Sequence, residues 1–169
     1  MLAYEIKNFG NRINTSKANN FLIKIVFISI VSIWVIGFLQ PILFNHQDVV
    51  LNYIVKRIYS PVCHQDYNKC INIEKNAMLV CARCAGIYSG ALIAGLTAIL
   101  FQFAFIKIKT LLIFLLPLLV DVSFTTAGIY SYSKTLAFTT GLIFGIILSL
   151  FLLNEIEDLF LNKKNKENE

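Results

Sequence analysis

Residues 81–106 read CARCAGIYSGALIAGLTAILFQFAFI. This stretch contains a single charged residue, Arg83, and it is longer than the roughly 20 apolar residues with which a helix crosses a bilayer. It begins with a Cys-x-x-Cys motif formed by Cys81 and Cys84, so the expected point of entry into the membrane carries two thiols. The stretch therefore predicts a membrane-spanning helix with a candidate site at one end.

Three other apolar stretches have the length of a membrane span. The four expected helices cover about residues 21–44, 81–106, 111–130 and 136–153. Hydrophobic residues make up 57% of the chain and charged residues only 15%, whereas a soluble domain carries about 25% charged residues. We therefore predict an all-α, polytopic membrane protein with four transmembrane helices in one membrane domain, residues 21–153.

The remaining segments lie outside the expected spans. Residues 1–20 form a polar N-terminal segment, and the long apolar stretch after them, which no small-residue cleavage site follows, indicates a retained anchor rather than a signal peptide. Residues 45–80 form the one sizeable loop, between the first and second helices, and this loop carries Cys63 and Cys70. Residues 154–169 form a charged C-terminal tail.

Basic residues predict the orientation of the chain. With both termini on one side, nine lysines and arginines lie on that side and six lie on the side of the cysteine-bearing loop. Cytoplasmic segments carry the excess of basic residues, so we expect a multi-pass protein of the cell membrane with cytoplasmic termini and an extracytoplasmic cysteine loop. Because the basic residues flank the apolar stretches, the net charge of +5 indicates contact with the lipid bilayer and not with nucleic acid.

Small residues recur at every fourth position in two of the expected helices. One series is Gly86, Gly90 and Ala94, and the other is Gly141, Gly145 and Ser149. Such stripes let two helix backbones approach closely. They predict close helix packing, and they make the Gly86/Gly90 and Gly141/Gly145 faces candidates for the contact of a homo-oligomer.

A second cluster of candidate ligands precedes the Cys-x-x-Cys motif, at Cys63-His64-Gln65. Together the two clusters offer three sulfurs and one imidazole, a ligand set that suits a closed tetrahedral zinc site. We therefore predict a metal site, for zinc in the first place or for iron, with the ligands Cys63, His64, Cys81 and Cys84. Cys70 either replaces His64 or stays outside the site. The alternative is two structural disulfides, which an oxidising compartment permits.

Two charged residues complete the candidate site. Arg83 and the helix N-terminus favour the thiolate forms of Cys81 and Cys84. Asp121 lies inside the third expected helix, where an unpartnered carboxylate is costly, so it favours either proton transfer or a hydrogen bond that orients two helices. Its candidate partners are Arg83, Tyr88, Ser123, Thr125 and Thr126. The candidate catalytic residues are Cys81, Cys84, Arg83 and Asp121, and whether the chain is an enzyme stays open.

These residues resemble an uncharacterised family of small bacterial and archaeal membrane proteins, catalogued as domain of unknown function 2085. The family pattern is Cys-His-Gln, then Cys-x-Arg-Cys-x-Gly-x-Tyr at a helix start, then a Pro-x-x-x-Asp helix and a Gly-x-x-x-Gly helix. This chain meets it with Cys63-His64-Gln65, Cys81 to Tyr88, Pro117 with Asp121, and Gly141 with Gly145. The resemblance covers roughly residues 55–150 and implies a fold and a site but no activity. Cys70 looks like an addition, which leaves open a local disulfide with Cys63.

Three functions compete on these residues. The first is a metal-binding membrane protein, with a structural or a catalytic ion. The second is a thiol-disulfide oxidoreductase, because the layout resembles the membrane disulfide-bond oxidases and the vitamin K epoxide reductases. Cys81 and Cys84 would then face a bound quinone, and Cys63 and Cys70 would form the shuttle pair. The third, which rests on Asp121 alone, is a transporter component. The change Cys70→Ser separates the first two, because only a relay of two cysteine pairs requires Cys70.

Overall fold

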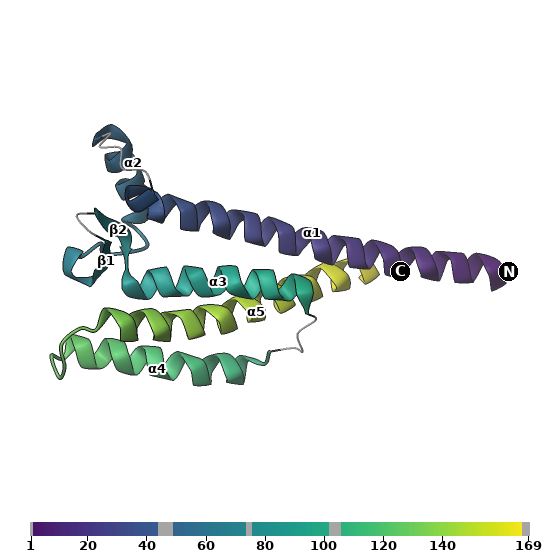
Figure 1. The fold of residues 1–169 in the computed structure, drawn as a ribbon. Coiled ribbons are helices and arrows are strands. Elements are labelled where there is room, and N and C mark those ends of the chain that lie inside the picture. The colour runs from purple at the N-terminus through teal and green to yellow at the C-terminus, as the bar shows by residue number, and fades with distance from the viewer. Residues whose placement is uncertain (1, 44–48, 74–75, 102–105, 167–169) are drawn as a thin grey trace.

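A computed structural model of the chain describes residues 2–43, 49–73, 76–101 and 106–166 (Figure 1). Four of its helices are long and apolar enough to cross a membrane. They are α1 (Leu2–Leu43), α3 (Ala82–Leu100), α4 (Ile108–Thr126) and α5 (Lys134–Lys166). Within α1 and α5 the spans are Phe21–Leu43 and Lys134–Leu159. The prediction of an all-α membrane protein with four spanning helices is confirmed.

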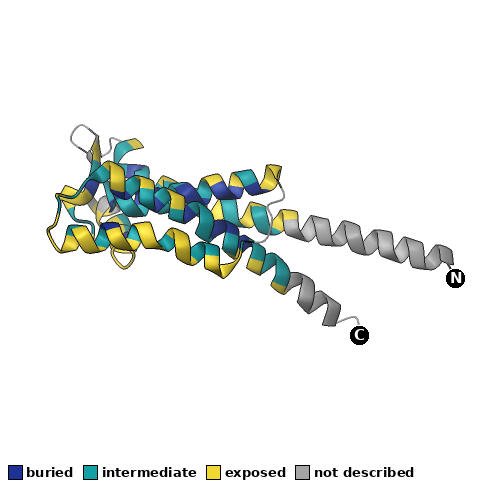
Figure 2. Ribbon diagram, turned by 90° about the horizontal axis from the view of Figure 1, so that it is seen from below, coloured by how far each residue is buried: buried dark blue, intermediate teal, exposed yellow. Residues whose placement is uncertain are grey.

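The spanning helices lie side by side along one direction (Figure 1). α3 packs between α1 and α5, and α4 packs against α5. Buried residues follow α3 and the face of α5 that it contacts, whereas α4 exposes most of its surface (Figure 2). The outer ends of α1 and α5 lie at one end of the bundle, and the segment between α1 and α3 lies at the other end (Figure 1). The cysteine-bearing segment therefore lies beside the turn that joins α4 to α5.

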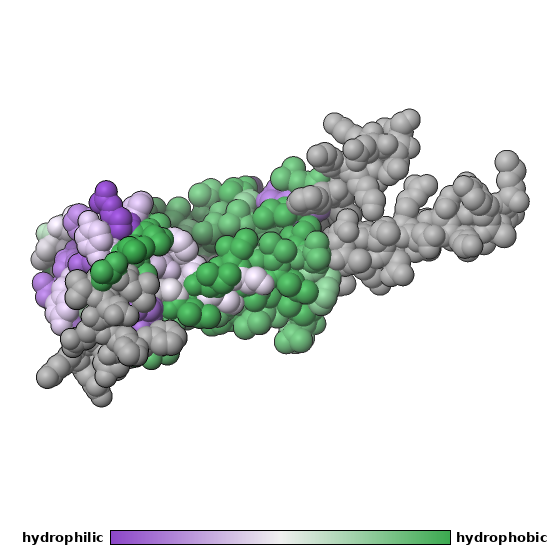
Figure 3. Space-filling model, turned by 90° about the horizontal axis from the view of Figure 1, so that it is seen from above, coloured by the Kyte–Doolittle hydropathy of each residue, from purple (hydrophilic) through white to green (hydrophobic). Residues whose placement is uncertain are grey.

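Apolar side chains cover the sides of the bundle. Hydrophilic side chains gather at the end that carries the cysteine segment (Figure 3). On α4 the exposed apolar residues include Ile113, Leu116 and Val120. An exposed apolar surface of this extent marks an interaction site, and on helices of membrane length that site is the contact with lipid.

The contact between α3 and α5 is the closest one in the bundle. Four glycines line it: Gly86, Gly90, Gly141 and Gly145. A side chain at Gly86 would collide with the carbonyl oxygen of Phe138, and a side chain at Gly145 would collide with that of Ile87. The close packing that the glycine stripes predict therefore occurs within one chain. Neither glycine face is free to make the homo-oligomer contact considered above.

The segment expected as a loop connects the first two spans and has secondary structure of its own. It contains α2 (Val49–Tyr59), a 3-10 turn (Tyr67–Lys69), β1 (Cys70–Ile73) and β2 (Asn76–Cys81). The two strands pair antiparallel, with Cys70 opposite Cys81. Residues 44–48 and 74–75, which also belong to the expected loop, lie outside the described residues. The hairpin leads directly into α3, so it fixes where that helix begins.

The end of α4 shows why the predicted helix boundaries differ from the observed ones. α4 ends at Thr126, where the apolar pattern predicts residue 130, because Gly128 takes the left-handed conformation with φ of 70°. The N–H of Ile129 donates to the carbonyl oxygen of Phe124 (3.0 Å), and the N–H of Gly128 donates to that of Thr125 (3.3 Å). These two bonds close a helix at a glycine and satisfy its last carbonyl groups.

The other helices also differ from the predicted ranges. α1 begins at Leu2 and so includes the segment expected as a polar N-terminus, and α5 continues to Lys166 through most of the expected tail. α3 ends at Leu100, and residues 102–105, which the prediction places in the second span, lie outside the described residues. Lysine and glutamate are good helix formers, which favours the extension of α5 beyond its apolar part.

Candidate metal centre

Three thiols converge at the end of the bundle where α3 begins. The sulfur atoms of Cys63, Cys81 and Cys84 all lie within 4.8 Å of one another. Cys63 follows α2, Cys81 ends β2, and Cys84 lies in the first turn of α3. Zinc binds thiolates at about 2.3 Å in tetrahedral geometry, which places its sulfurs roughly 3.8 Å apart. The three sulfurs therefore lie at a spacing that one metal ion can bridge after a small adjustment.

α1 holds the turn that carries Cys63. The N–H of Cys63 donates to the carbonyl oxygen of Tyr59 (3.0 Å), which makes the residue an extension of the last turn of α2. Tyr59 is buried, and its hydroxyl donates to the carbonyl oxygen of Trp34 on α1 (2.7 Å). The rings of Trp34 and Tyr59 lie 4.5 Å apart, and Phe38 packs edge-on against Tyr59. Aromatic packing on α1 thus fixes the position of the first sulfur.

The hairpin brings Cys81 to the same point. Val80, the residue before it, is fully buried, and so is Ala82 after it. Cys81 occupies the N-cap position of α3 with extended backbone, and its side chain makes no capping hydrogen bond. Its N–H donates to the sulfur of Cys63 (3.1 Å). The Cys81 thiol is therefore left to face the other two sulfurs.

The surroundings favour one thiolate in the metal-free cluster. Hydrogen bonds from the thiols of Cys81 and Cys84 lower the pKa of Cys63 to about 2, although burial acts in the opposite direction. The pKa of Cys81 is raised, because its thiol donates to Cys63. Cys70 lies outside this group of thiols, and burial raises its pKa to about 11. The cluster thus carries a negative charge at Cys63 before any cation binds.

One predicted ligand, His64, and its alternative, Cys70, are not part of the group of three sulfurs. His64 is exposed to solvent, and no imidazole nitrogen belongs to the group of three ligand atoms. Cys70 is only 2% exposed and lies across the hairpin from Cys81, yet its sulfur is not part of the group. All four cysteines are free thiols. The structure therefore brings together three of the four predicted metal ligands.

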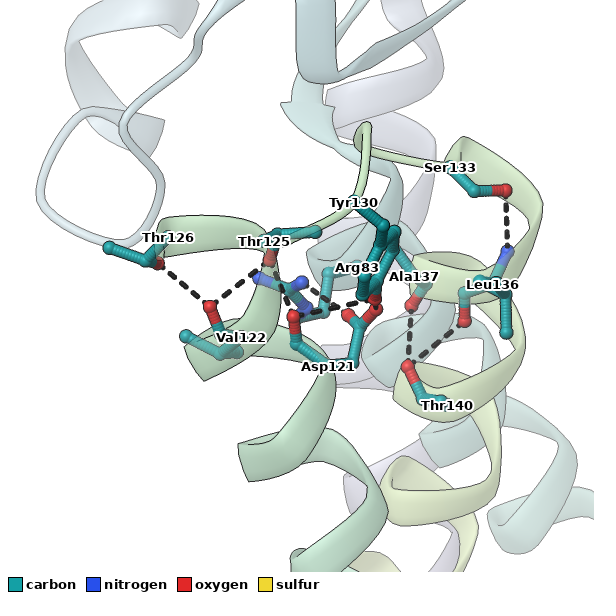
Figure 4. Close-up of polar contacts among 10 residues, drawn as sticks. All are labelled: Arg83, Asp121, Val122, Thr125, Thr126, Tyr130, Ser133, Leu136, Ala137 and Thr140. Carbon is teal, nitrogen blue, oxygen red and sulfur yellow. Dashed lines mark hydrogen bonds and ion pairs between the residues drawn. The ribbon is translucent and has the colours of Figure 1, made fainter. Parts of the chain in front are cut away.

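A buried ion pair joins α3 to α4 (Figure 4). The carboxylate of Asp121 on α4 is 7% exposed, and it pairs with the guanidinium of Arg83 on α3. The hydroxyl of Tyr130 donates to the other carboxylate oxygen. The hydroxyl of Thr125 donates to the backbone carbonyl of Asp121. The charge on Arg83 is therefore balanced by a partner on a different helix.

Tyr130 is the partner of Asp121 that sequence reasoning missed. Arg83 and Thr125 were among the candidates, whereas Tyr88 packs with Trp34 and Phe38 on the other side of α3. The signal that could have found Tyr130 is Gly128, because a glycine stop at this point turns the chain back over the end of α4.

The sequence of this chain has relatives in known proteins. Residues 63–151, more than half of the chain, match the family model described as "Predicted membrane protein (DUF2085)". One relative is "Uncharacterized protein MJ1492" of Methanocaldococcus jannaschii, which is 32% identical over 105 residues. The aligned region covers 57% of this chain and 64% of the relative. The chain thus spans somewhat less than two thirds of that relative's length, and no solved structure matches. Cys63, the Cys-x-x-Cys motif and the Arg83–Asp121 pair lie within the matched range. The chain belongs to the DUF2085 family of membrane proteins.

Proposed function

We propose that the protein binds one metal ion, zinc in the first place, through the thiolates of Cys63, Cys81 and Cys84. The observation that supports this most is the convergence of three sulfurs, from the turn after α2, from β2 and from α3, to within 4.8 Å. Thiolate ligands favour zinc and iron over magnesium or calcium. The hydrogen bonds that keep Cys63 ionised add to the preference for a cation.

The fourth ligand in this proposal is His64. It follows Cys63 directly and is exposed at the edge of the cluster, so its imidazole can turn toward the sulfurs without disturbing the core. Three thiolates and one imidazole make a closed structural site. Water in the fourth position would instead leave an open site of the catalytic kind.

A metal ion in this position would act as a clamp. It would tie the turn after α2 and the end of β2 to the first turn of α3, in place of the weaker hydrogen bonds that Cys63 accepts from the N–H of Cys81 and from the thiols of Cys81 and Cys84. Structural zinc contributes its binding energy to folding. The proposed role is therefore to fix the hairpin segment on the end of the membrane bundle.

Cobalt substitution tests the ligand set. Cobalt(II) bound to the purified protein should show thiolate charge-transfer absorption that is lost in Cys81→Ser and Cys84→Ser and kept in Cys70→Ser. The change His64→Ala should shift the visible ligand-field bands, whereas His46→Ala, the control at the other histidine of the chain, should leave them unchanged. Unchanged bands in His64→Ala would exclude His64 as a ligand while leaving the three thiolates in place.

A thiol-disulfide oxidoreductase is the second candidate. It is favoured by the free thiols of Cys81 and Cys84, which lie beside the ionised sulfur of Cys63. Oxidation of Cys81 and Cys84 to a disulfide releases two electrons and two protons, which a quinone would take up to form a quinol. Thiol counts before and after a soluble quinone is added to reduced, metal-free protein test this. Loss of two thiols per chain supports it, and an unchanged count excludes it.

For Asp121 we propose a structural role, and for the chain an orientation with both termini in the cytoplasm. Arg83 balances the charge of the Asp121 carboxylate, and Tyr130 donates a hydrogen bond to it. The proposed role of Asp121 is therefore to orient α3 and α4, and a role in transport is not proposed.

The excess of basic residues at the end that carries the termini supports a cytoplasmic position for that end. The metal centre would then lie at the extracytoplasmic face of the cell membrane.

A further inference from the structure

α2 carries two exposed stripes of different character. Val55 and Tyr59 pack into the core beside α1 and β2. Val50, Ile54 and Ile58 recur at every fourth position and are exposed, at 72%, 50% and 51%. Residues at this spacing share one face of a helix. Among the described residues, α2 thus presents an exposed apolar stripe beside the face that packs into the core.

The second stripe lines a pocket. The pocket has a volume of about 190 Å³, and it is lined by Tyr53, Lys56, Arg57, Ser60 and Gln65. The first four residues follow one another at steps of three, one and three, which places them on one side of the helix and of the turn that continues it. Two cationic side chains, a phenol, a hydroxyl and an amide therefore converge on one space next to the apolar stripe.

Gln65 closes this pocket by an unusual backbone conformation. Its φ of 52° makes it the one residue other than glycine with a left-handed backbone in the described part of the chain. Its side-chain amide donates to the carbonyl oxygen of Lys56 (2.9 Å). A non-glycine residue in this conformation is strained, and such strain persists at sites where the surroundings require it. Gln65 belongs to the Cys63-His64-Gln65 motif: its backbone hydrogen-bonds to the sulfur of Cys63, whereas its side chain lines the pocket.

In the part of the chain that the structure describes, no acid pairs with the positive charges of the pocket. Among the described residues, neither Lys56 nor Arg57 forms an ion pair with a carboxylate. Asp66, the acid next to Gln65 in the chain, pairs with Lys69 (3.7 Å) and accepts the N–H of Asn68. A pocket with an arginine fork, an ammonium group and neutral hydrogen-bond donors suits a phosphate group.

The position of α2 indicates where that phosphate comes from. Only five residues separate the end of the span Phe21–Leu43 from the start of α2 at Val49, so α2 lies near the membrane surface. A helix with an apolar stripe and basic residues rests in the plane of the interface, with its apolar side at the acyl boundary. We propose that the pocket of Tyr53, Lys56, Arg57, Ser60 and Gln65 binds the phosphate of an anionic lipid headgroup.

Native mass spectrometry of the full-length protein in uncharged detergent tests the proposal. Phosphatidylglycerol and phosphatidylcholine are titrated separately. The wild-type protein should retain phosphatidylglycerol in preference. Each basic residue near an anionic lipid surface contributes about a fivefold gain in affinity, so Lys56→Gln with Arg57→Gln should weaken the binding by roughly 10- to 30-fold. Equal retention of the two lipids by the wild-type protein overturns the proposal.

A matched pair of substitutions and a soluble competitor complete the experiment. Lys107→Gln with Lys109→Gln removes two exposed lysines at the opposite end of the bundle, outside the pocket, and should leave the affinity unchanged. An equal loss of affinity in this control would show that the lipid is held by general charge attraction, and it would overturn the proposal of binding in the pocket. Displacement of the lipid by inorganic phosphate, at concentrations where chloride has no effect, would assign the pocket to a soluble anion and overturn the lipid source. Thermal unfolding of both double variants in the same detergent checks that they are folded, and neither pair of substitutions changes a proposed metal ligand.

Discussion

At the scale of single residues, Asp121 and Arg83 are the charges that the membrane makes most costly to separate. Asp121 is 7% exposed and lies five residues before the end of α4, roughly 7.5 Å along the helix. The side chain of Arg83 is 19% exposed. Removing one partner of such a pair leaves an uncompensated buried charge, whereas replacing both with apolar residues can be neutral.

A double-mutant cycle gives the first prediction. Asp121→Leu should lower the free energy of unfolding by about 3 kcal/mol. The combined change Asp121→Leu with Arg83→Leu should recover most of that loss. Thermal unfolding in detergent measures each variant. Strictly additive losses in the double variant would show that the two charges do not interact, which contradicts the ion pair.

The thiols give a prediction about pH. Because hydrogen bonds lower the pKa of Cys63 to about 2, its thiolate should persist as the pH falls from above 9 to about 4, where an ordinary cysteine is fully protonated. Ultraviolet thiolate absorbance of the metal-free, reduced protein should show about one thiolate per chain across this range. Cys63→Ser should remove it. Cys70→Ser should not, because burial raises the pKa of Cys70 to about 11.

Residue spacing predicted most of the site and missed what depends on chain reversal. The steps between Cys63, Cys81 and Cys84 identified the three sulfurs that meet. Asp121 stood out because a charge in an apolar helix needs a partner. Tyr130 reaches Asp121 only because Gly128 turns the chain back, so no periodicity connects the two. The exposure of His64 depends on a turn after α2 that the sequence did not indicate.

At the scale of helices and strands, the glycine contact between α3 and α5 is the strongest constraint on the bundle. A side chain at Gly86 or Gly145 meets a carbonyl oxygen of the opposite helix, and a backbone atom cannot move away as a flexible side chain can. We predict that Gly86→Leu and Gly145→Leu each prevent folding or lower the melting temperature sharply, because overpacking costs about 1–3 kcal/mol even where side chains can adjust.

The control places the same leucine side chain at an exposed position of α5, the helix of Gly145. Thr139 lies on α5 and is exposed, so Thr139→Leu should leave the melting temperature in detergent nearly unchanged. If both glycine variants have the same melting temperature as Thr139→Leu, the close approach of the two helices is contradicted. Loss of folding in all three variants would show that the bundle does not tolerate a new leucine even at an exposed position, and it would likewise fail to support the contact.

The same elements show which parts of the fold can be predicted from sequence. The four spans follow from apolar length, since no other structure satisfies the backbone in lipid. The hairpin does not, because strands of 4 and 6 residues outside the membrane are shorter than any hydropathy window. The end of α4 depends on the φ of one glycine, and apolar residues continue past it. Length therefore predicts spans, and local turn chemistry decides their ends.

For the whole molecule, four spans place the two termini on one side of the membrane and the cysteine end on the other. We predict that green fluorescent protein fused to the C-terminus is fluorescent, since it folds in the cytoplasm, and that a membrane-impermeant label reaches a cysteine placed at Ser131 from outside. Ser131 is exposed in the turn beside the cysteine segment. A label that reaches Ser131→Cys only after the membrane is opened would reverse the orientation.

The whole molecule also explains why the thiols lie where they do. α1, α3 and α5 form the packed part of the bundle, and the segment between α1 and α3 covers one end of it. That segment is joined to the bundle by the aromatic contacts of Tyr59 with α1 and by the cluster of Cys63, Cys81 and Cys84. A metal ion bound there would couple the folding of the segment to the folding of the membrane domain.

Metal content per chain tests the central claim most directly. The protein is purified in detergent without oxygen and without chelator, and its metals are measured by elemental analysis. We predict about one zinc or iron ion per chain, lost in Cys63→Ser, Cys81→Ser and Cys84→Ser and kept in Cys70→Ser. Absence of metal from wild-type protein whose four thiols are free and titratable would contradict the metal centre, and it would leave thiol chemistry as the function of the three sulfurs.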